Sequence, residues 1–323
     1  MKVFVIGNGG WGTALGMVLA GNGNQVTIWG PFEEELSGIR ETGENTTYLP
    51  GVKIPSVIQW TADPSEIGDA DLVVVVTPSR FYRSSLETFK PHLSESALLV
   101  SATKGLDEAT HQRMSEVAKD VLGKDIAILS GPSHAEEVAR GVPTAVTIAG
   151  EKAEQMQQAF MGKTFRVYTS DDPLGVEIGG TLKNIIAVAA GILDGIGLGD
   201  NSKAALMTRG LAEISRLGVC LGAKPETFSG LSGIGDLIVT CASRHSRNRS
   251  VGERLGKGES LDQIMGGMKQ VAEGIWNAKA ARDLAVEHGI QMPITEEVCK
   301  IVEEGKDPRQ ALKDLMSRDP RAE

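Results

Sequence analysis

Lys183 lies inside a long helical pattern that has three glycines just before it, Gly175, Gly179 and Gly180. Glycine costs about 1 kcal/mol at an interior helical position, so this density needs a reason in packing or in function. At helical spacing, Gly179 and Gly180 lie beside the lysine on a small, uncharged face. Partial burial there would lower the lysine pKa toward values that suit a proton donor. A solvated surface lysine is the alternative, and these residues alone leave both interpretations open.

A second glycine-rich segment lies at the N-terminus, where Gly7, Gly9 and Gly12 form the pattern GxGxxG. It follows a strand-like run and opens a helical pattern, and a second strand-like run comes next. In this βαβ context Gly7 permits the tight turn, Gly9 lets the backbone approach a pyrophosphate, and Gly12 allows close helix–sheet packing. The segment predicts a dinucleotide site with its phosphates at the helix N-terminus.

The residues after the second strand leave the choice between NAD and NADP open. An acid at the end of that strand would bind the ribose 2′-hydroxyl, and a nearby Arg would accommodate a 2′-phosphate. The strand instead ends in Trp29-Gly30-Pro31, and Glu33-Glu34-Glu35 follows. We interpret these glutamates as a solvated helix start, where negative charge suits the helix dipole.

A run of hydrogen-bond donors occupies residues 244–249, with the sequence RHSRNR. Arginine forks suit phosphate oxygens, and Ser246 and Asn248 add neutral donors beside Arg247. A solvated basic loop is the alternative. A nucleic-acid surface is disfavoured because no aromatic residues are interleaved and the whole chain carries a net charge of −9.

The composition of the 323 residues narrows the class of protein. An excess of 42 acidic over 33 basic residues disfavours non-specific binding to nucleic acid or anionic membranes. The three cysteines have no CxxC spacing and the five histidines have no metal-ligand spacing, so we expect no disulfide framework and no metal site. The aliphatic runs fall far short of the ~20 residues that span a bilayer, and no signal-peptide pattern opens the chain. A cytoplasmic protein without stable membrane insertion is predicted.

The first half of the chain alternates apolar strand-like runs with helical patterns, which predicts a doubly wound parallel sheet. After about residue 170 strand-like runs nearly vanish, and Asp172-Pro173 is a typical helix start. We therefore predict a dinucleotide-binding domain over 1–175 and an all-helical domain over 176–323. The predicted strands are 2–6, 25–29, 72–76, 98–101, 126–129, 144–149 and 165–169, and the predicted helices are 11–20, 112–122, 174–193, 203–221, 250–255, 275–287, 295–304 and 308–316.

With these motifs in order, the chain resembles the NAD(P)-dependent glycerol-3-phosphate dehydrogenases over about residues 3 to 305. The motifs are Gly7–Gly12, Lys104 in ATKG, Gly131-Pro132-Ser133, Lys183-Asn184, Gly235-Asp236-Leu237 with Thr240-Cys241, Ser246–Arg249, Val271–Gly274 and Met292-Pro293-Ile294. The resemblance implies reduction of dihydroxyacetone phosphate to sn-glycerol 3-phosphate for glycerophospholipid synthesis. It also implies a Rossmann-type domain followed by a helical domain, as in 6-phosphogluconate-dehydrogenase-like folds, and a cytoplasmic homodimer that uses NADP or NAD.

The resemblance also implies roles for single residues. Lys183 would be the proton donor and acceptor and Lys104 a second active-site lysine near both ligands, with Asn184, Asp236 and Thr240 completing the polar pocket. The substrate phosphate would meet Ser246, Arg247 and Asn248, and Gly131 and Ser133 resemble further substrate contacts. Cofactor contacts would come from Gly7, Gly9, Gly10, Trp11, Gly12, Lys104, Ala135, Arg247, Val271 and Glu273. At Pro31 the chain departs from the family, which often has a basic residue there, so a strong preference for NADPH is in doubt.

Several of these residues also have plain structural interpretations. Lys104 could be an exposed turn lysine before Gly105, Asp236 could cap the helix that follows it, and Trp11 could pack between helix and sheet. A related dehydrogenase acting on a 3-hydroxy acid is a second enzyme hypothesis. A non-catalytic dinucleotide sensor is a third, although it leaves Lys104, Lys183, Asp236 and Arg247 unexplained.

Overall fold

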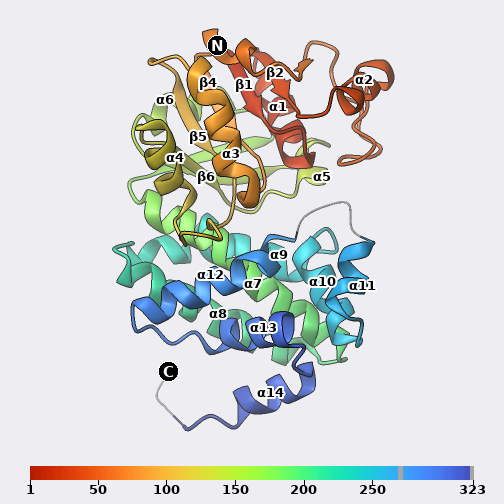
Figure 1. The fold of residues 1–323 in the computed structure, drawn as a ribbon, viewed down its shortest axis with the longest axis vertical. Coiled ribbons are helices and arrows are strands. Elements are labelled where there is room, and N and C mark those ends of the chain that lie inside the picture. Colours follow the sequence, from red (N-terminus) through yellow and green to blue (C-terminus); the bar gives the residue numbers. More distant parts are fainter. Residues whose placement is uncertain (268–271, 321–323) are drawn as a thin grey trace.

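A computed structural model of the chain describes residues 1–267 and 272–320. The chain forms a sheet part, at the top of Figure 1, and a helical part below it. The sheet strands are β1 (Lys2–Ile6), β2 (Gln25–Trp29), β3 (Gln59–Thr61), β4 (Leu72–Val75), β5 (Leu98–Ser101), β6 (Ala127–Ser130), β7 (Thr144–Ala149) and β8 (Phe165–Ser170).

The eight strands follow the order β3-β2-β1-β4-β5-β6-β7-β8. All neighbouring strands are parallel except β6 and β7, which are antiparallel. The chain crosses from one side of β1 to the other after β3, so the carboxyl ends of β1 and β4 border a topological switch point, where ligands bind in open α/β sheets. The predicted doubly wound sheet followed by an all-helical region is confirmed, with β7 and β8 reversed relative to the rest.

Helices connect the strands and then make up the second half of the described chain. In the sheet part they are α1 (Gly10–Gly21), α2 (Glu33–Thr42), α3 (Ser79–Phe89), α4 (Met114–Leu122), α5 (Ala135–Val138) and α6 (Ala153–Phe160), with short turns η1 (Pro64–Asp69) and η2 (Lys90–His92). The helical part contains α7 (Pro173–Gly195), α8 (Asp200–Cys220), η3 (Pro225–Ser229), η4 (Leu231–Gly235), α9 (Asp236–Ala242), α10 (Arg247–Gly256), α11 (Leu261–Gly266), α12 (Glu273–Glu287), α13 (Pro293–Glu304) and α14 (Pro308–Met316).

The long helix α7 is the centre of the helical part. It begins as predicted, because the Asp172 side chain accepts a hydrogen bond from the Gly175 N–H at 2.9 Å and Pro173 occupies its first turn. The predicted domain boundary between 175 and 176 falls in this first turn. By length and composition α7 could cross a membrane, but its apolar stretch is buried inside the protein, as in the core helix of a soluble protein.

Part of the second glycine cluster serves the contact between α7 and α10. A Cβ on Gly191 would lie 2.0 Å from the carbonyl oxygen of Arg249, and one on Gly252 would lie 2.0 Å from that of Val188. No side chain fits at these distances, so the two helices pack backbone against backbone. This close crossing fixes α10, with the predicted phosphate residues at its start, against the helix that carries Lys183.

Candidate active site

The glycine-rich loop between β1 and α1 has the geometry that a pyrophosphate requires. Gly7 has φ +125°, a conformation that other residues rarely adopt, and a Cβ on Gly12 would lie 2.0 Å from the Gly7 carbonyl oxygen. A Cβ on Gly9 would have no atom within 4 Å, so the outer side of this residue is open. The N-terminus of α1 has no side-chain cap and no acidic residue in its first turn. These residues therefore fit a dinucleotide diphosphate on the free N–H groups of α1.

Two further predicted cofactor residues border this loop. A Cβ on Gly10 would lie 3.6 Å from the Ala135 side chain, so α5 faces the start of α1. Trp11 is half-buried and its ring lies 6.5 Å from that of Phe165, which agrees with a packing role. Its indole N–H is nevertheless buried with no partner in the described part of the chain.

Lys183 is buried in the middle of α7, with 6% of its surface exposed. The solvated-lysine alternative is therefore wrong. Its ammonium group donates to Asp236 Oδ1 at 2.5 Å and to Thr240 Oγ1 at 2.6 Å. Asp236 and Thr240 lie one turn apart on α9, and their side chains face α7 together.

The carboxylate of Asp236 binds both predicted active-site lysines. Its second oxygen, Oδ2, accepts a hydrogen bond from Lys104 Nζ at 2.6 Å, while Oδ1 binds Lys183. Lys104 also donates to the Gly131 carbonyl oxygen at 3.1 Å, so it is not an exposed turn residue. The Asp236 side chain makes no cap at the start of α9, which rejects the capping alternative for this residue.

This cluster carries two positive charges and one negative charge in a buried space. Burial lowers the pKa of Lys183 to about 8, although the Asp236 carboxylate works against this effect and the Lys104 charge adds to it. Burial alone would raise the pKa of Asp236, but Lys104 and Lys183 outweigh it and the pKa lies below its usual value. Each lysine uses two of its three N–H bonds on these described partners, so each has one left for a ligand oxygen.

The glycines before Lys183 let neighbouring segments pack closely against α7 and do not leave an open space beside the lysine. A Cβ on Gly179 would lie 2.6 Å from the Ser232 carbonyl oxygen, and one on Gly180 would lie 2.2 Å from Ser130 Oγ. Gly180 also lies beside the aliphatic stem of Lys104. The predicted small face is present, but it is filled by β6, η4 and the second lysine, which is what buries Lys183.

The predicted substrate residues Gly131 and Ser133 lie at the end of β6, beside the lysine cluster. Gly131 has φ +143°, and its carbonyl oxygen accepts hydrogen bonds from both Lys104 and Ser133 Oγ, the latter at 2.9 Å. The loop is thereby tied to the same ammonium group as Asp236. Ser133 is bound within this loop, so a substrate contact would use the remaining hydrogen-bonding capacity of its hydroxyl.

Some of the donors in residues 244–249 are engaged in hydrogen bonds within the protein, and others are free to bind a ligand. Ser246 caps α10, its hydroxyl accepting from the Arg249 N–H at 3.2 Å, and Arg249 pairs with Asp194 at 2.7 Å. Arg247 is exposed, and its guanidinium makes no hydrogen bond or ion pair to the described residues. Arg247 at the N-terminus of α10 is therefore a free cation in a position that suits a phosphate.

Hydrogen bonds of the Asn248 side-chain amide join α10 to α7 and α12. Asn248 Nδ2 donates to Asn184 Oδ1 at 3.0 Å, and Asn248 Oδ1 accepts from the Gly274 N–H at 2.9 Å. Both asparagines are buried, so these bonds fix α10 and α12 against α7. Asn184 thus neighbours Lys183 in sequence but binds Asn248.

Glu273 links the helical part to the sheet part. Its carboxylate accepts from the Ser79 N–H at 3.0 Å and from Ser79 Oγ at 2.6 Å, at the N-terminus of α3. This position lies after β4, beside the switch point of the sheet, where a dinucleotide is expected. Val271, the other predicted cofactor contact of this segment, lies outside the described residues.

Two polar residues near the site were not predicted to act in it. The sequence put His134 near the pocket only through its neighbours; the residue is half-buried, and burial and then the Lys183 charge lower its pKa. Its Nε2 and the hydroxyl of Ser130 are buried without partners among the described residues. The only signal in the sequence was that both flank the Gly131 motif, which gives no side-chain direction.

Comparison with known proteins gives one family for both parts of the chain. Residues 2–156 match the family model described as NAD-dependent glycerol-3-phosphate dehydrogenase N-terminus, and residues 172–313 match the model of its C-terminus. A relative from Moorella thermoacetica, named glycerol-3-phosphate dehydrogenase for NAD(P)+, is 52% identical over 98% of this chain and 96% of its own length. A relative of the same name from Pelotomaculum thermopropionicum is 50% identical over 98% and 93%.

Solved structures agree with this match. The glycerol-3-phosphate dehydrogenase of Coxiella burnetii has a TM-score of 0.95 and 37% identity, covering 98% of this chain and 99% of that one. A ketopantoate reductase of Ralstonia eutropha, at 18% identity and a TM-score of 0.64, shares the fold alone. With both parts matched and about half of the residues shared over the full length, the chain belongs to the NAD-dependent glycerol-3-phosphate dehydrogenase family.

Proposed function

We propose that this chain reduces dihydroxyacetone phosphate to sn-glycerol 3-phosphate with a reduced nicotinamide dinucleotide, and that Lys183 supplies the proton. The observation that carries the assignment is the buried ammonium group of Lys183, held by Asp236 and Thr240 with one N–H bond left over. The names of the relatives support the substrate. The product is the backbone of glycerophospholipids, and we assign the enzyme to their synthesis.

The lysine cluster suits the charge that develops during ketone reduction. The nicotinamide, when bound, supplies a hydride to the carbonyl carbon, and negative charge then appears on the carbonyl oxygen. The free N–H bond of Lys183 stabilises that oxygen and transfers its proton to it. Because its pKa is about 8, Lys183 is mostly protonated at neutral pH and still gives up its proton readily.

Asp236, Thr240 and Lys104 prepare this step. Asp236 and Thr240 fix the direction of the Lys183 ammonium, and the carboxylate offsets the repulsion between the two lysines. Lys104 has its own free N–H bond for an oxygen of the substrate. The cluster keeps a net positive charge, which favours an anionic substrate and the oxyanion formed from it.

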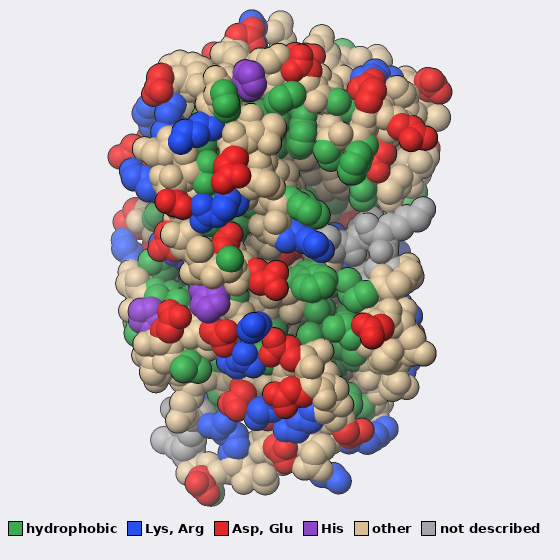
Figure 2. All heavy atoms as spheres, viewed as in Figure 1, with side chains coloured by type: hydrophobic (Ala, Val, Ile, Leu, Met, Phe, Trp, Pro, Cys, Tyr) green, Lys and Arg blue, Asp and Glu red, His purple; other side chains and the backbone are tan. Residues whose placement is uncertain are grey.

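The phosphate of the substrate would lie at the N-terminus of α10. Arg247 is free to bind it, and Asn184 and Asn248 hold α10 against the helix that carries Lys183. We further propose a cytoplasmic location and a homodimer, both from the family. On the face in view, Figure 2 shows acidic and basic side chains intermingled, without a continuous basic surface for nucleic acid.

The activity is tested by nicotinamide absorbance with dihydroxyacetone phosphate and either NADH or NADPH. No loss of absorbance with either cofactor would refute the proposal. Lys183→Ala separates an enzyme from a sensor, because it should lower kcat by orders of magnitude while dinucleotide binding remains. Equal kcat in this variant would remove Lys183 from the mechanism.

A further inference from the structure

The glycine-rich loop, the end of β2 and the first turn of α2 meet at one carboxylate, that of Glu35. Asn8, the second residue of the glycine motif, is buried against Gly30, where a Cβ would lie 2.6 Å from Asn8 Cγ. Asn8 Nδ2 donates to Glu35 Oε2 at 3.0 Å. The interpretation of the three glutamates as a solvated helix start is therefore wrong for Glu35, which is half-buried while Glu33 and Glu34 are exposed.

The segment after α2 holds this arrangement from a second side. Asn45 Nδ2 donates to the Asn8 carbonyl oxygen at 2.7 Å and to Thr13 Oγ1 at 3.0 Å. Asn45 Oδ1 accepts from the Tyr48 N–H at 3.2 Å. Burial and then the charge of Glu35 raise the pKa of Tyr48. The position of Glu35 is therefore built into the loop that receives the dinucleotide.

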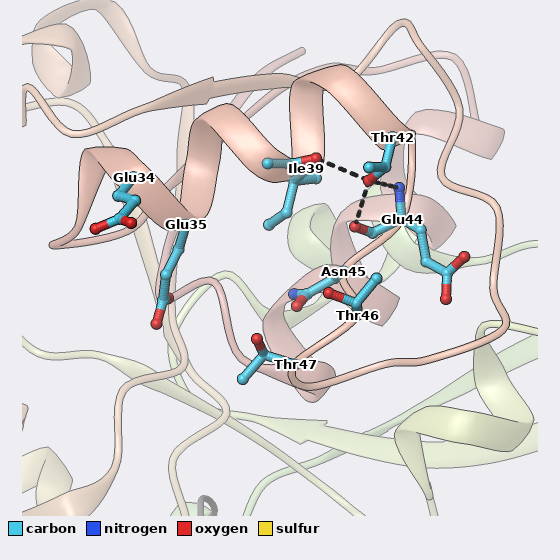
Figure 3. A pocket seen from close by; sticks show the side chains of 9 residues that line it. Glu34, Glu35, Ile39, Thr42, Glu44, Asn45, Thr46 and Thr47 are labelled. Carbon is cyan, nitrogen blue, oxygen red and sulfur yellow. Dashed lines mark hydrogen bonds between the residues drawn. The ribbon is translucent and has the colours of Figure 1, made fainter.

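The surroundings of this carboxylate are acidic. A small cavity of about 170 Å³ lies between α2 and residues 44–47, and Glu34, Glu35 and Glu44 line it without any lysine or arginine (Figure 3). Arg40, the basic residue of α2, is engaged elsewhere, pairing with Glu33 and donating to the Trp60 carbonyl oxygen at 2.9 Å. A 2′-phosphate beside Asn8 would meet the Glu35 carboxylate, and Arg40 is not free to offset that charge.

We propose that Glu35 selects the cofactor, accepting hydrogen bonds from the adenosine ribose hydroxyls of NAD(H) and repelling the 2′-phosphate of NADP(H). The inference rests on the proposed function, since it concerns the same dinucleotide site. In Rossmann-type domains this choice is made beside the end of the second strand, where an acid binds the 2′-hydroxyl and an arginine accommodates a 2′-phosphate. Here the strand end is Gly30, and the acid comes from the next helix and is oriented by Asn8.

The proposal is tested by measuring the Kd of the full chain for NADH and for NADPH in the absence of substrate, with tryptophan fluorescence as the signal. We expect NADH to bind at least about tenfold more tightly than NADPH, since like charges brought together weaken binding. Glu35→Gln keeps an acceptor for Asn8 and removes the charge, so the preference should shrink by about tenfold. Glu41→Gln is the matched control, since Glu41 is exposed on the same helix, and its ratio should equal that of the parent.

The outcomes separate this inference from the function on which it rests. Tighter binding of NADPH by the parent chain would overturn the inference, and so would an unchanged ratio in Glu35→Gln. Both results would leave the proposed dehydrogenase activity standing, because each requires dinucleotide binding. Failure of both nucleotides to bind would instead overturn the proposed function, and the inference with it.

Discussion

Replacing Asp236 by Asn should move the acidity of Lys183, because one carboxylate controls the charge of the whole cluster. Its oxygens lie 2.5 Å from Lys183 Nζ and 2.6 Å from Lys104 Nζ. An opposite charge at this range shifts a pKa by about 1–3 units. Without it, the pKa of Lys183 should fall from about 8 to roughly 5–7.

The consequence is measured as the pH dependence of kcat with saturating dihydroxyacetone phosphate and NADH. Reduction needs protonated Lys183, so kcat of the parent should fall as pH rises through about 8. In Asp236→Asn the fall should come at lower pH, and a pKa near 6 would leave about a tenth of the lysine protonated at neutral pH. The variant should therefore lose about tenfold in kcat at neutral pH from this effect alone.

Two controls separate a shift in the pKa of Lys183 from loss of folding and from a general effect of removing a carboxylate. Removing one partner of a buried ion pair costs about 3–5 kcal/mol of folding free energy, so thermal unfolding must first show that the variant is folded. Asp194→Asn makes the same chemical change in a carboxylate that pairs with Arg249 and Lys203, and its profile should match the parent. If the fall in kcat stays near pH 8 in folded Asp236→Asn, the Asp236 carboxylate does not control the pKa of Lys183.

Three further changes test other parts of the structure. Arg247→Ala should raise KM for dihydroxyacetone phosphate by roughly tenfold to a hundredfold with a smaller change in kcat, because a charged hydrogen bond contributes about 1.5–3 kcal/mol. Gly252→Ala places a Cβ 2.0 Å from the Val188 carbonyl oxygen and should lower thermal stability by about 1–3 kcal/mol, whereas Gly266→Ala, with open space around it, should not. Burial raises the pKa of Glu213 from 4.5 to about 6, so its contribution to stability is present below pH 4.5 and is lost as pH rises through 6. The parent should therefore lose about 2 kcal/mol of unfolding free energy between acidic and neutral pH, and Glu213→Gln should not, as measured by urea unfolding at both pH values.

The sheet could be predicted where the strands are apolar almost throughout. The strands 2–6, 25–29, 98–101 and 144–149 match the predictions. Strand 2–6 is buried on both faces after Lys2 and forms a continuous apolar run, whereas strand 25–29 alternates buried and more exposed residues. The edge strand β3 was missed, since its three residues, Gln59–Thr61, contain no such run. The reversal of β7 was also missed, because strand direction depends on the path of the connection and not on the apolar pattern.

The site could be predicted as a set of residues but not as an arrangement. Asp236 and Lys183 were expected in one polar pocket, whereas nothing in the sequence indicated the second bond of that carboxylate, to Lys104, which joins residues 132 positions apart. The second bond changes the net charge of the cluster and thereby the pKa of Lys183. With one lysine, the pair would be neutral and Asp236 would hold the proton on Lys183 firmly. With two, the cluster keeps a positive charge, and the repulsion from Lys104 helps burial to lower the pKa of Lys183.

Glu35 shows the same limit at the other end of the cofactor. The rule that places an acid at the end of the second strand counts residues along the chain, whereas a side chain from the next helix can reach the same place. Gly30 leaves the place open, Asn8 fills it, and the amide of Asn8 brings in a carboxylate from the first turn of α2. Each of the three residues is unremarkable alone. Only their contact gives the strand end the acidic group that the sequence lacks at that position.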